Sequence, residues 1–198
     1  MIASRRDLRH QLFQLAAEQG GYFTAAQARK IGYSYQAQAH NVHAGNWVRL
    51  NRGMFRLVEW IPELHDDLIR WTLWSGGQAV VSHESALAVH GISELESSRL
   101  RLTVPPGFSL QNPAVTLYHN DVPDKDILQL AGFRVTTVIR SLIDVAAILA
   151  DEDQLKRAVQ EALDSGVFTL RQLRSRAEEV DLRAALRIER ALVSVSAL

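Results

Sequence analysis

The run at residues 82–91 holds the side chains of this chain that could most readily perform chemistry. It reads Ser-His-Glu-Ser-Ala-Leu-Ala-Val-His-Gly, and a serine, a histidine and a carboxylate are the components of a hydrolytic triad. Consecutive side chains on a helix point about 100° apart, so we expect no proton relay among Ser82, His83 and Glu84. His83 and His90 lie two turns apart, roughly 10 Å, which is too far for one metal ion. The run therefore predicts a helix that begins after an N-cap serine, with a binding or catalytic role as the lesser alternatives.

A second cluster of ionisable residues lies in one loop, at Asp121, Asp124, Lys125 and Asp126. A metal-dependent nuclease needs an aspartate followed by a Glu-x-Lys-like trio on one sheet edge, and no predicted strand supplies that trio. The cluster therefore predicts a solvated turn rather than a cation site. The sequence has no glycine-rich phosphate loop, and its lack of cysteine excludes thiolate metal sites, disulfides and a cysteine nucleophile. We expect no metal, no cofactor and no enzymatic activity.

The charge of the chain is divided between its two parts. The 198 residues include 22 basic and 22 acidic side chains, so the formal net charge is zero. Residues 1–57 hold eight basic and two acidic side chains, a net charge of +6, whereas residues 58–198 hold 14 basic and 20 acidic ones, a net charge of −6. Local neutralisation of phosphates, and not global charge, drives nucleic-acid binding. The sequence thus predicts a basic nucleic-acid-binding module joined to an acidic one.

The N-terminal third has the pattern of a winged helix-turn-helix. Apolar residues at helical spacing predict a first helix over residues 7–19. Two short helices follow, capped by Thr24 and Ser34 and joined by a glycine-containing turn, as in helix-turn-helix motifs. Residues 47–57 then alternate as two strands around a short turn, which predicts a basic hairpin wing.

The second of the two short helices is the predicted recognition helix. Its Gln and Asn side chains can pair bidentately with adenine, and Ser and Tyr can reach phosphates or base edges. It carries no Lys or Arg, so we expect the preceding helix and the wing to anchor the phosphates. The predicted DNA-binding residues are Arg29, Lys30, Ser34, Tyr35, Gln36, Gln38, Asn41, Arg49, Asn51, Arg52 and Arg56. The alternative is a protein-docking module with solvated arginines.

The remainder of the chain predicts helices and strands in mixed order. Strands are expected over residues 79–81, 99–105, 114–120 and 132–138, and helices over 63–77, 139–150, 153–166, 170–179 and 181–192. The predicted fold class is therefore α+β, with a winged helix-turn-helix over residues 1–60 and an α+β domain over residues 61–198. The second domain is expected to hold a small, mostly antiparallel sheet flanked by helices.

Nothing in the sequence predicts contact with a membrane. No apolar run approaches the roughly 18 residues of a membrane span, and Met1–Arg9 lacks the apolar stretch of a signal peptide. We therefore expect a cytoplasmic protein. A monomer in solution that dimerises on DNA is compatible with binding to inverted repeats.

The predicted winged helix, the run V-S-H-E-S-A-L-A-V-H-G at residues 81–91 and the strands after it together resemble the AbiEi family. Members of this family are antitoxins of type IV toxin–antitoxin systems and are also described as AbiEi-type transcriptional regulators. The resemblance covers roughly residues 8–165. The winged helix is shared by many regulators, so the run at residues 81–91 is the more specific part of the resemblance.

The resemblance implies a protein with two activities. It implies that the winged helix binds double-stranded operator DNA at promoter inverted repeats and represses its own operon. It also implies that the C-terminal domain counteracts a nucleotidyltransferase-like toxin, without implying a direct complex. The family's DNA contacts are implied at Tyr35, Gln36, Gln38, Asn41, Arg49 and Arg52. Arg157, Arg171, Arg174 and Arg176 form a second basic group, for which solvated helix faces are the simpler interpretation.

Two other functions remain compatible with the residues. One is a winged-helix regulator without a toxin, whose second domain serves dimerisation or effector binding. The more remote one is an enzyme that inactivates the toxin by covalent modification such as phosphorylation, although no nucleotide-binding motif supports it.

Overall fold

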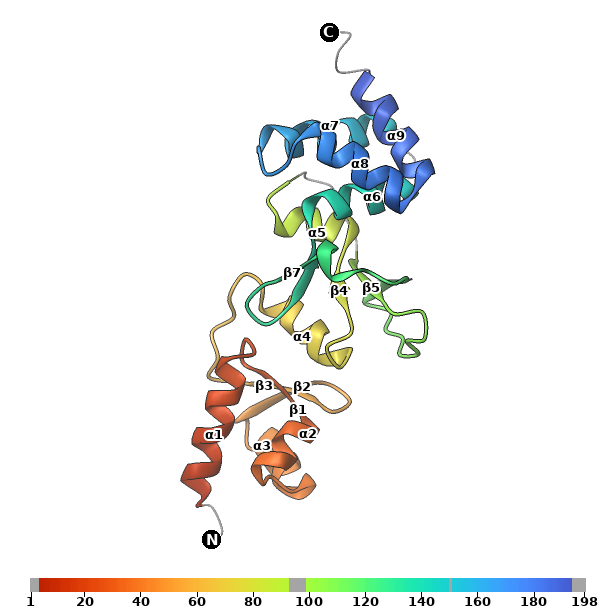
Figure 1. The fold of residues 1–198 in the computed structure, drawn as a ribbon. Coiled ribbons are helices and arrows are strands. Elements are labelled where there is room, and N and C mark those ends of the chain that lie inside the picture. The colour runs from red at the N-terminus through yellow and green to blue at the C-terminus, as the bar shows by residue number, and fades with distance from the viewer. Residues whose placement is uncertain (1–3, 93–98, 150, 194–198) are drawn as a thin grey trace. The chain divides into compact units, whose positions relative to one another are not determined.

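The computed structural model describes residues 4–92, 99–149 and 151–193 (Figure 1). Within them the chain divides into two compact units. The first unit is the described part of Met1–Gly77 together with Ala131–Phe133, and the second is the described part of Gln78–Leu130 and Arg134–Leu198. Among the described residues, no helix is long and apolar enough to cross a membrane. The predicted helix end at residue 150 lies outside the described residues.

The first unit is a winged helix. Its elements are α1 (Arg5–Ala17), β1 (Tyr22–Thr24), α2 (Ala25–Ile31), α3 (Tyr35–His43), β2 (Trp47–Asn51), β3 (Met54–Leu57) and α4 (Asp66–Trp74). The three strands form an antiparallel sheet in the order β1-β3-β2, so the wing hairpin pairs with the strand that follows α1. The predicted helix-turn-helix and hairpin are both present.

Local capping sets the start of each short helix in this unit. Thr24 and Gln27 form a reciprocal capping box at α2, and Ser34 Oγ accepts the backbone N–H of Ala37 at α3. Gly32 has φ 128°, a conformation that L side chains rarely adopt, and it ends α2 one residue before the turn into α3. These caps fix where α3 begins and therefore which of its residues face outward.

A small aromatic core holds the winged helix together. Phe23 from β1 lies edge-on to Trp47 from β2, with ring centroids 4.8 Å apart, and stacks on Phe55 from β3 at 5.7 Å. Leu12 and Ala16 cover these rings from α1. The outward faces of α3 and the wing are thus carried on a rigid base.

The second unit combines a five-stranded sheet with helices. Its elements are β4 (Val80–Val81), α5 (His83–Val89), β5 (Leu100–Val104), β6 (Val115–His119), the 3-10 turn η1 (Asp124–Asp126), β7 (Ile127–Gln129), β8 (Arg134–Thr136), α6 (Val138–Ile148), α7 (Glu152–Asp164), α8 (Leu170–Val180) and α9 (Leu182–Val193). The chain as a whole is α+β, as predicted. Helices α6 to α9 pack on one another and share an apolar core with α5 (Figure 1).

The sheet of the second unit is mixed, whereas we expected it to be mostly antiparallel. Its strand order is β6-β5-β4-β8-β7, and two of the four pairings, β5 with β6 and β4 with β8, are parallel. The loop at residues 105–114 does not form a tight hairpin; it returns the chain to the same end of the sheet, so β6 runs alongside β5. β7 was not predicted as a strand, because its three residues are too short to show a period of two.

Candidate nucleic-acid interface

The outward face of α3 is formed by residues that recur every three to four positions. Tyr35, Gln36, Ala39, His40 and His43 are exposed, and this spacing places them on one side of the helix. Tyr35, which is 65% exposed, begins the face. His40 and His43, polar positions of the predicted recognition helix whose side chains could reach phosphates or base edges, thus lie on this face.

Gln38 does not face outward, and its predicted role in reading bases is wrong. Its side chain is buried, and its Nε2 donates to the carbonyl oxygens of Ala25 and Tyr33, each at 3.1 Å. Two residues along a helix turn the side chain by about 200°, so Gln36 and Gln38 point to opposite sides. Gln38 joins α3 to α2 and to the turn between them.

Asn41 is likewise engaged within the unit. Its Nδ2 donates to the carbonyl oxygen of Ala37 at 2.8 Å, and its Oδ1 accepts from Nδ2 of Asn46 at 3.1 Å. The side chain is half-buried. Asn41 therefore supports the connection from α3 to β2, and its role in reading bases stays a prediction.

The N-terminal end of α3 brings together four of the predicted residues. Ser34 Oγ accepts the backbone N–H of Ala37 as the helix cap, which leaves its hydroxyl hydrogen able to donate to a phosphate. The guanidinium of Arg29 lies 4.6 Å from the ring centroid of Tyr35, an arrangement that holds both side chains at the surface. Lys30 is exposed beside Arg29 at the last turn of α2, where a cation also complements the helix dipole.

The wing presents two exposed cations. Arg49 lies on β2 with its guanidinium 5.6 Å from the ring centroid of Phe55, and Arg52 lies in the turn of the hairpin. Asn51 and Arg56 are half-buried; Asn51 Oδ1 and Arg56 Nε have no hydrogen-bond partner among the described residues. The structure thus separates the predicted wing residues into an exposed pair and a partly covered pair.

Residues 10–58 match a family model described as "Transcriptional regulator, AbiEi antitoxin". The winged helix is therefore similar to the AbiEi-type regulators that this model describes. The match confirms the predicted resemblance over a region that covers less than half of the chain. The crystal structure of the RV2827C protein from Mycobacterium tuberculosis is similar, with a TM-score of 0.50 and 13% sequence identity over 96% of this chain and 82% of that chain. This likeness shows the fold alone, and no curated protein sequence matches the chain.

The Ser82 run lies outside the AbiEi-type match and forms a buried polar cluster in the second unit. Ser82 precedes α5, and its Oγ accepts a hydrogen bond from Thr103 at 2.8 Å and lies 2.9 Å from Nδ1 of His83. We expected these neighbouring side chains to diverge, but Ser82 is extended and His83 has φ 55°, so neither is in helical geometry. Ser82 makes no side-chain cap bond to α5, which corrects its predicted capping role.

The environment of His83 keeps the imidazole neutral. The ring stacks on Tyr118 with centroids 3.7 Å apart and is buried. Burial, reinforced by the nearby charges of Arg101 and Arg140, lowers the pKa of His83 to about 3. Ser82 and His83 are both inaccessible to a substrate. The burial of both side chains favours a structural role for the cluster, which stays a prediction.

Glu84 and Ser85 link α5 to β5 through contacts with Arg101. Glu84 Oε2 pairs with Nε of Arg101 at 2.7 Å, and Ser85 Oγ accepts the backbone N–H of Arg101 at 2.9 Å. The guanidinium of Arg101 also contacts the hydroxyl of Tyr118. Every polar residue at the start of α5 thus has a partner on the neighbouring strands.

Three members of the aspartate loop, Asp121, Asp124 and Lys125, are exposed as expected of a solvated turn, but Asp126 is not, which corrects our expectation for that residue. Asp126 is buried and accepts from Arg140 Nη1 at 3.0 Å and from Arg176 Nη2 at 2.6 Å. Burial acts to raise the pKa of Asp126, but hydrogen bonds from Arg176 and Arg140 outweigh it and hold the pKa below its ordinary value. Among the described residues, no group of His, Asp and Glu side chains could hold a metal ion.

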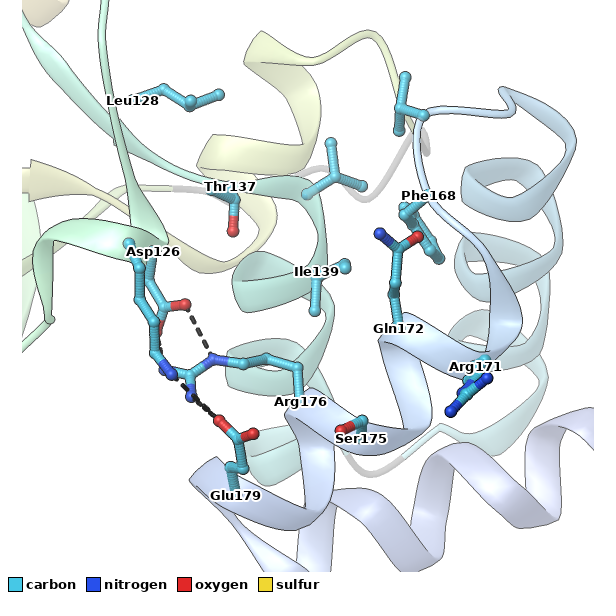
Figure 2. A pocket seen from close by; sticks show the side chains of 13 residues that line it. Asp126, Leu128, Thr137, Ile139, Phe168, Arg171, Gln172, Ser175, Arg176 and Glu179 are labelled. Carbon is cyan, nitrogen blue, oxygen red and sulfur yellow. Dashed lines mark hydrogen bonds and ion pairs between the residues drawn. The ribbon is translucent and has the colours of Figure 1, made fainter.

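A cleft of about 640 Å³ lies beside this ion network, between η1, the start of α6 and α8 (Figure 2). Arg176 reaches from α8 to Asp126 and to Glu179, while Ile139 and Phe168 line the apolar side. Two of the four arginines in the predicted basic group are therefore ion-paired: Arg176 is engaged here and Arg174 pairs with Glu189 at 2.6 Å.

Proposed function

We propose that the chain is a transcriptional regulator that binds double-stranded operator DNA through α3 and the wing. The observation that carries this proposal is the exposed face of α3 with cations on either side, Arg29 and Lys30 at the end of α2 and Arg49 and Arg52 on the wing. Phosphate contacts from these cations would position α3 in the major groove. The AbiEi-type match supports repression of the protein's own operon at promoter inverted repeats.

The residue roles within this interface follow from exposure. Gln36 and His40, not Gln38 and Asn41, are proposed to contact base edges, because their side chains are on the outward face of α3. Tyr35 and Arg29 lie together at the start of α3 and are proposed to contact the sugar–phosphate backbone of the DNA.

The test is a fluorescence-anisotropy titration of the full chain against its own upstream DNA and a scrambled control. Replacing Arg49 and Arg52 with Ala should weaken binding to both DNAs and reduce the slope of log K against log salt by about 2. The matched control replaces Arg183 and Arg190, two exposed arginines of α9, and changes the net charge equally. Equal effects of the two double variants would place the DNA surface elsewhere.

We further propose that the second unit, within the domain predicted over residues 61–198, counteracts a nucleotidyltransferase-like toxin. Support comes from the AbiEi resemblance and from the separation of this unit from the winged helix. The test expresses a nucleotidyltransferase gene encoded beside the gene of this chain, with and without the full chain. The nucleotidyltransferase alone should arrest growth, and co-expression of the full chain should restore it. The Arg49 and Arg52 double variant should still restore it, because repression and neutralisation are proposed to reside in different units.

A regulator whose second unit serves only dimerisation or effector binding is the alternative. Failure of the full chain to restore growth would favour it. If the chain neutralises the toxin by covalent modification, the toxin recovered from the rescued cells should have an increased mass. An unchanged mass would favour neutralisation without covalent modification.

A further inference from the structure

A groove of about 890 Å³ lies within the winged helix, between α1 and α3. Its apolar wall includes Leu8, Leu12, Tyr33 and Trp47. Phe13 stands at its edge with 42% of its surface exposed, although a phenylalanine this accessible gains little from folding. The volume falls in the range of small-molecule sites, and the lining is largely apolar with a few polar groups, as such sites require.

A positive charge lies at the edge of this groove, at a position on α1 where it does not stabilise the helix. Arg5 and Arg6 are the first two residues of α1, where cations face the positive end of the helix dipole. Arg5 lines the groove and has no ion-pair partner in the described part of the chain, whereas Arg6 does not line it. Since the charge of Arg5 does not favour the helix, its position at the groove is better explained by recognition of an anion.

Arg9 adds a second, exchangeable cation. It pairs with Glu59 at 3.0 Å, but the two side chains are 75% and 50% exposed, so the pair contributes little and an anionic ligand can replace the carboxylate. The Tyr33 ring lies edge-on to Trp47 with centroids 5.0 Å apart. Burial raises the pKa of Tyr33, against the opposing effect of Arg9, so a neutral hydroxyl and a cation lie near each other in the groove.

From this combination we infer that the groove binds a small organic anion with an apolar, aromatic body. The body packs against Phe13 and the wall formed by Tyr33 and Trp47, and the anionic group pairs with Arg5 and Arg9. Gln36 and His40 line the same groove from α3. Occupation therefore competes with DNA for these two side chains, a coupling that rests on the proposed function.

The binding site is tested without DNA. The full chain is titrated with anilinonaphthalene sulfonate, whose aromatic body and single sulfonate match the proposed chemistry and whose fluorescence rises when it is desolvated. Phe13→Ser should weaken the dye about fivefold, whereas Ile61→Ser, at an exposed apolar residue outside the groove, should not. Arg5→Ala should weaken it about fivefold relative to Arg6→Ala.

The two pairs of variants decide the proposal. All four positions are exposed, so the fold is expected to survive, which circular dichroism checks. Equal affinities within either pair would overturn the proposed site. A fifth variant, Ala37→Phe, fills the groove from α3. The Ala37→Phe single variant and the Phe13→Ser, Ala37→Phe double variant should bind the dye equally weakly.

The coupling is tested separately with labelled operator DNA. The dye should raise the apparent Kd of the wild-type chain for DNA and have about fivefold less effect on the Phe13→Ser variant. Dye binding with no change in DNA affinity would overturn the coupling while leaving the site in place. Dye binding by a chain that shows no DNA binding at all would overturn the proposed function and not the ligand site.

Discussion

At the scale of single residues, two glutamines of α3 have different roles: the Gln38 amide is hydrogen-bonded inside the unit, and the Gln36 amide lies at the surface. Gln38 satisfies two backbone carbonyls, whereas Gln36 is exposed. Gln38→Ala should lower the free energy of unfolding by about 2 kcal/mol, because it leaves buried carbonyls without donors. Urea denaturation measures this, with Gln36→Ala as the matched control at an exposed position. A smaller loss for Gln38 than for Gln36 would contradict the assignment of the two amides.

His83 and Asp144 make the stability of the second unit depend on pH in opposite directions. Burial lowers the pKa of His83 to about 3, so its contribution is present above the unfolded value near 6.5 and is lost as the pH falls toward 3. Burial raises the pKa of Asp144 to about 6, only partly offset by Arg140, so its contribution is present below 3.8 and is lost as the pH rises through 6. The His83 shift is the larger, so net stability should fall on acidification.

Replacing His83 tests this dependence. Asn tolerates the positive φ of the position and does not titrate, so His83→Asn should remove about 2 kcal/mol of the stability that is lost between pH 7 and pH 5. The measurement is the free energy of unfolding across that range. His119→Asn, at an exposed histidine of the same unit, is the control. Parallel pH profiles for the wild type and His83→Asn would exclude His83 as the source.

At the scale of elements, Asp126 links three parts of the second unit. It accepts from Arg140 on α6 and Arg176 on α8 while belonging to η1. Asp126→Asn should cost about 3 kcal/mol of unfolding free energy, because it leaves the buried Arg140 with less compensation. Asp124→Asn, two residues earlier and exposed, should have almost no effect. Similar losses for the two variants would show that the network contributes little to joining the elements.

The elements that could be predicted are those with local signals. Thr24 and Ser34 each cap a helix at the position that the sequence predicts, since an N-cap bond involves residues only three apart. The parallel pairing of β5 with β6 could not be predicted, because it depends on the path of a loop and not on either strand. Helical spacing could have predicted that Gln38 points inward, but we expected an exposed side chain because glutamine is polar.

The candidate interface was predictable to a similar degree. Arg49 and Arg52 follow from a basic hairpin in the sequence, and the structure places both in solvent. The partners of Asp126 were not predictable, since Arg140 and Arg176 lie 14 and 50 residues away in the sequence. Local hydrogen bonds are encoded by neighbours, whereas ion networks depend on tertiary packing.

At the scale of the whole molecule, the charge division has a consequence for selectivity. A protein with net charge +6 in residues 1–57 would bind any DNA, whereas the net charge of −6 in residues 58–198 opposes accumulation on phosphate in general. The contacts proposed between α3 and particular bases are short-ranged and would not be opposed in the same way. On the proposed function, we therefore expect the acidic part to raise the ratio of operator binding to non-specific binding.

This effect should appear when acidic surface charge is removed far from the winged helix in sequence. Replacing Glu152, Asp153 and Glu178, all exposed, with Gln or Asn should tighten binding to scrambled DNA about tenfold at low ionic strength, and more than binding to the operator. The difference should vanish above roughly 0.3 M salt, where charges are screened within a few ångström. Ser109→Ala with Gln111→Ala, at exposed neutral positions, controls for surface substitution. Unchanged non-specific affinity at low salt would show that the acidic charge of the second unit does not set the selectivity of DNA binding.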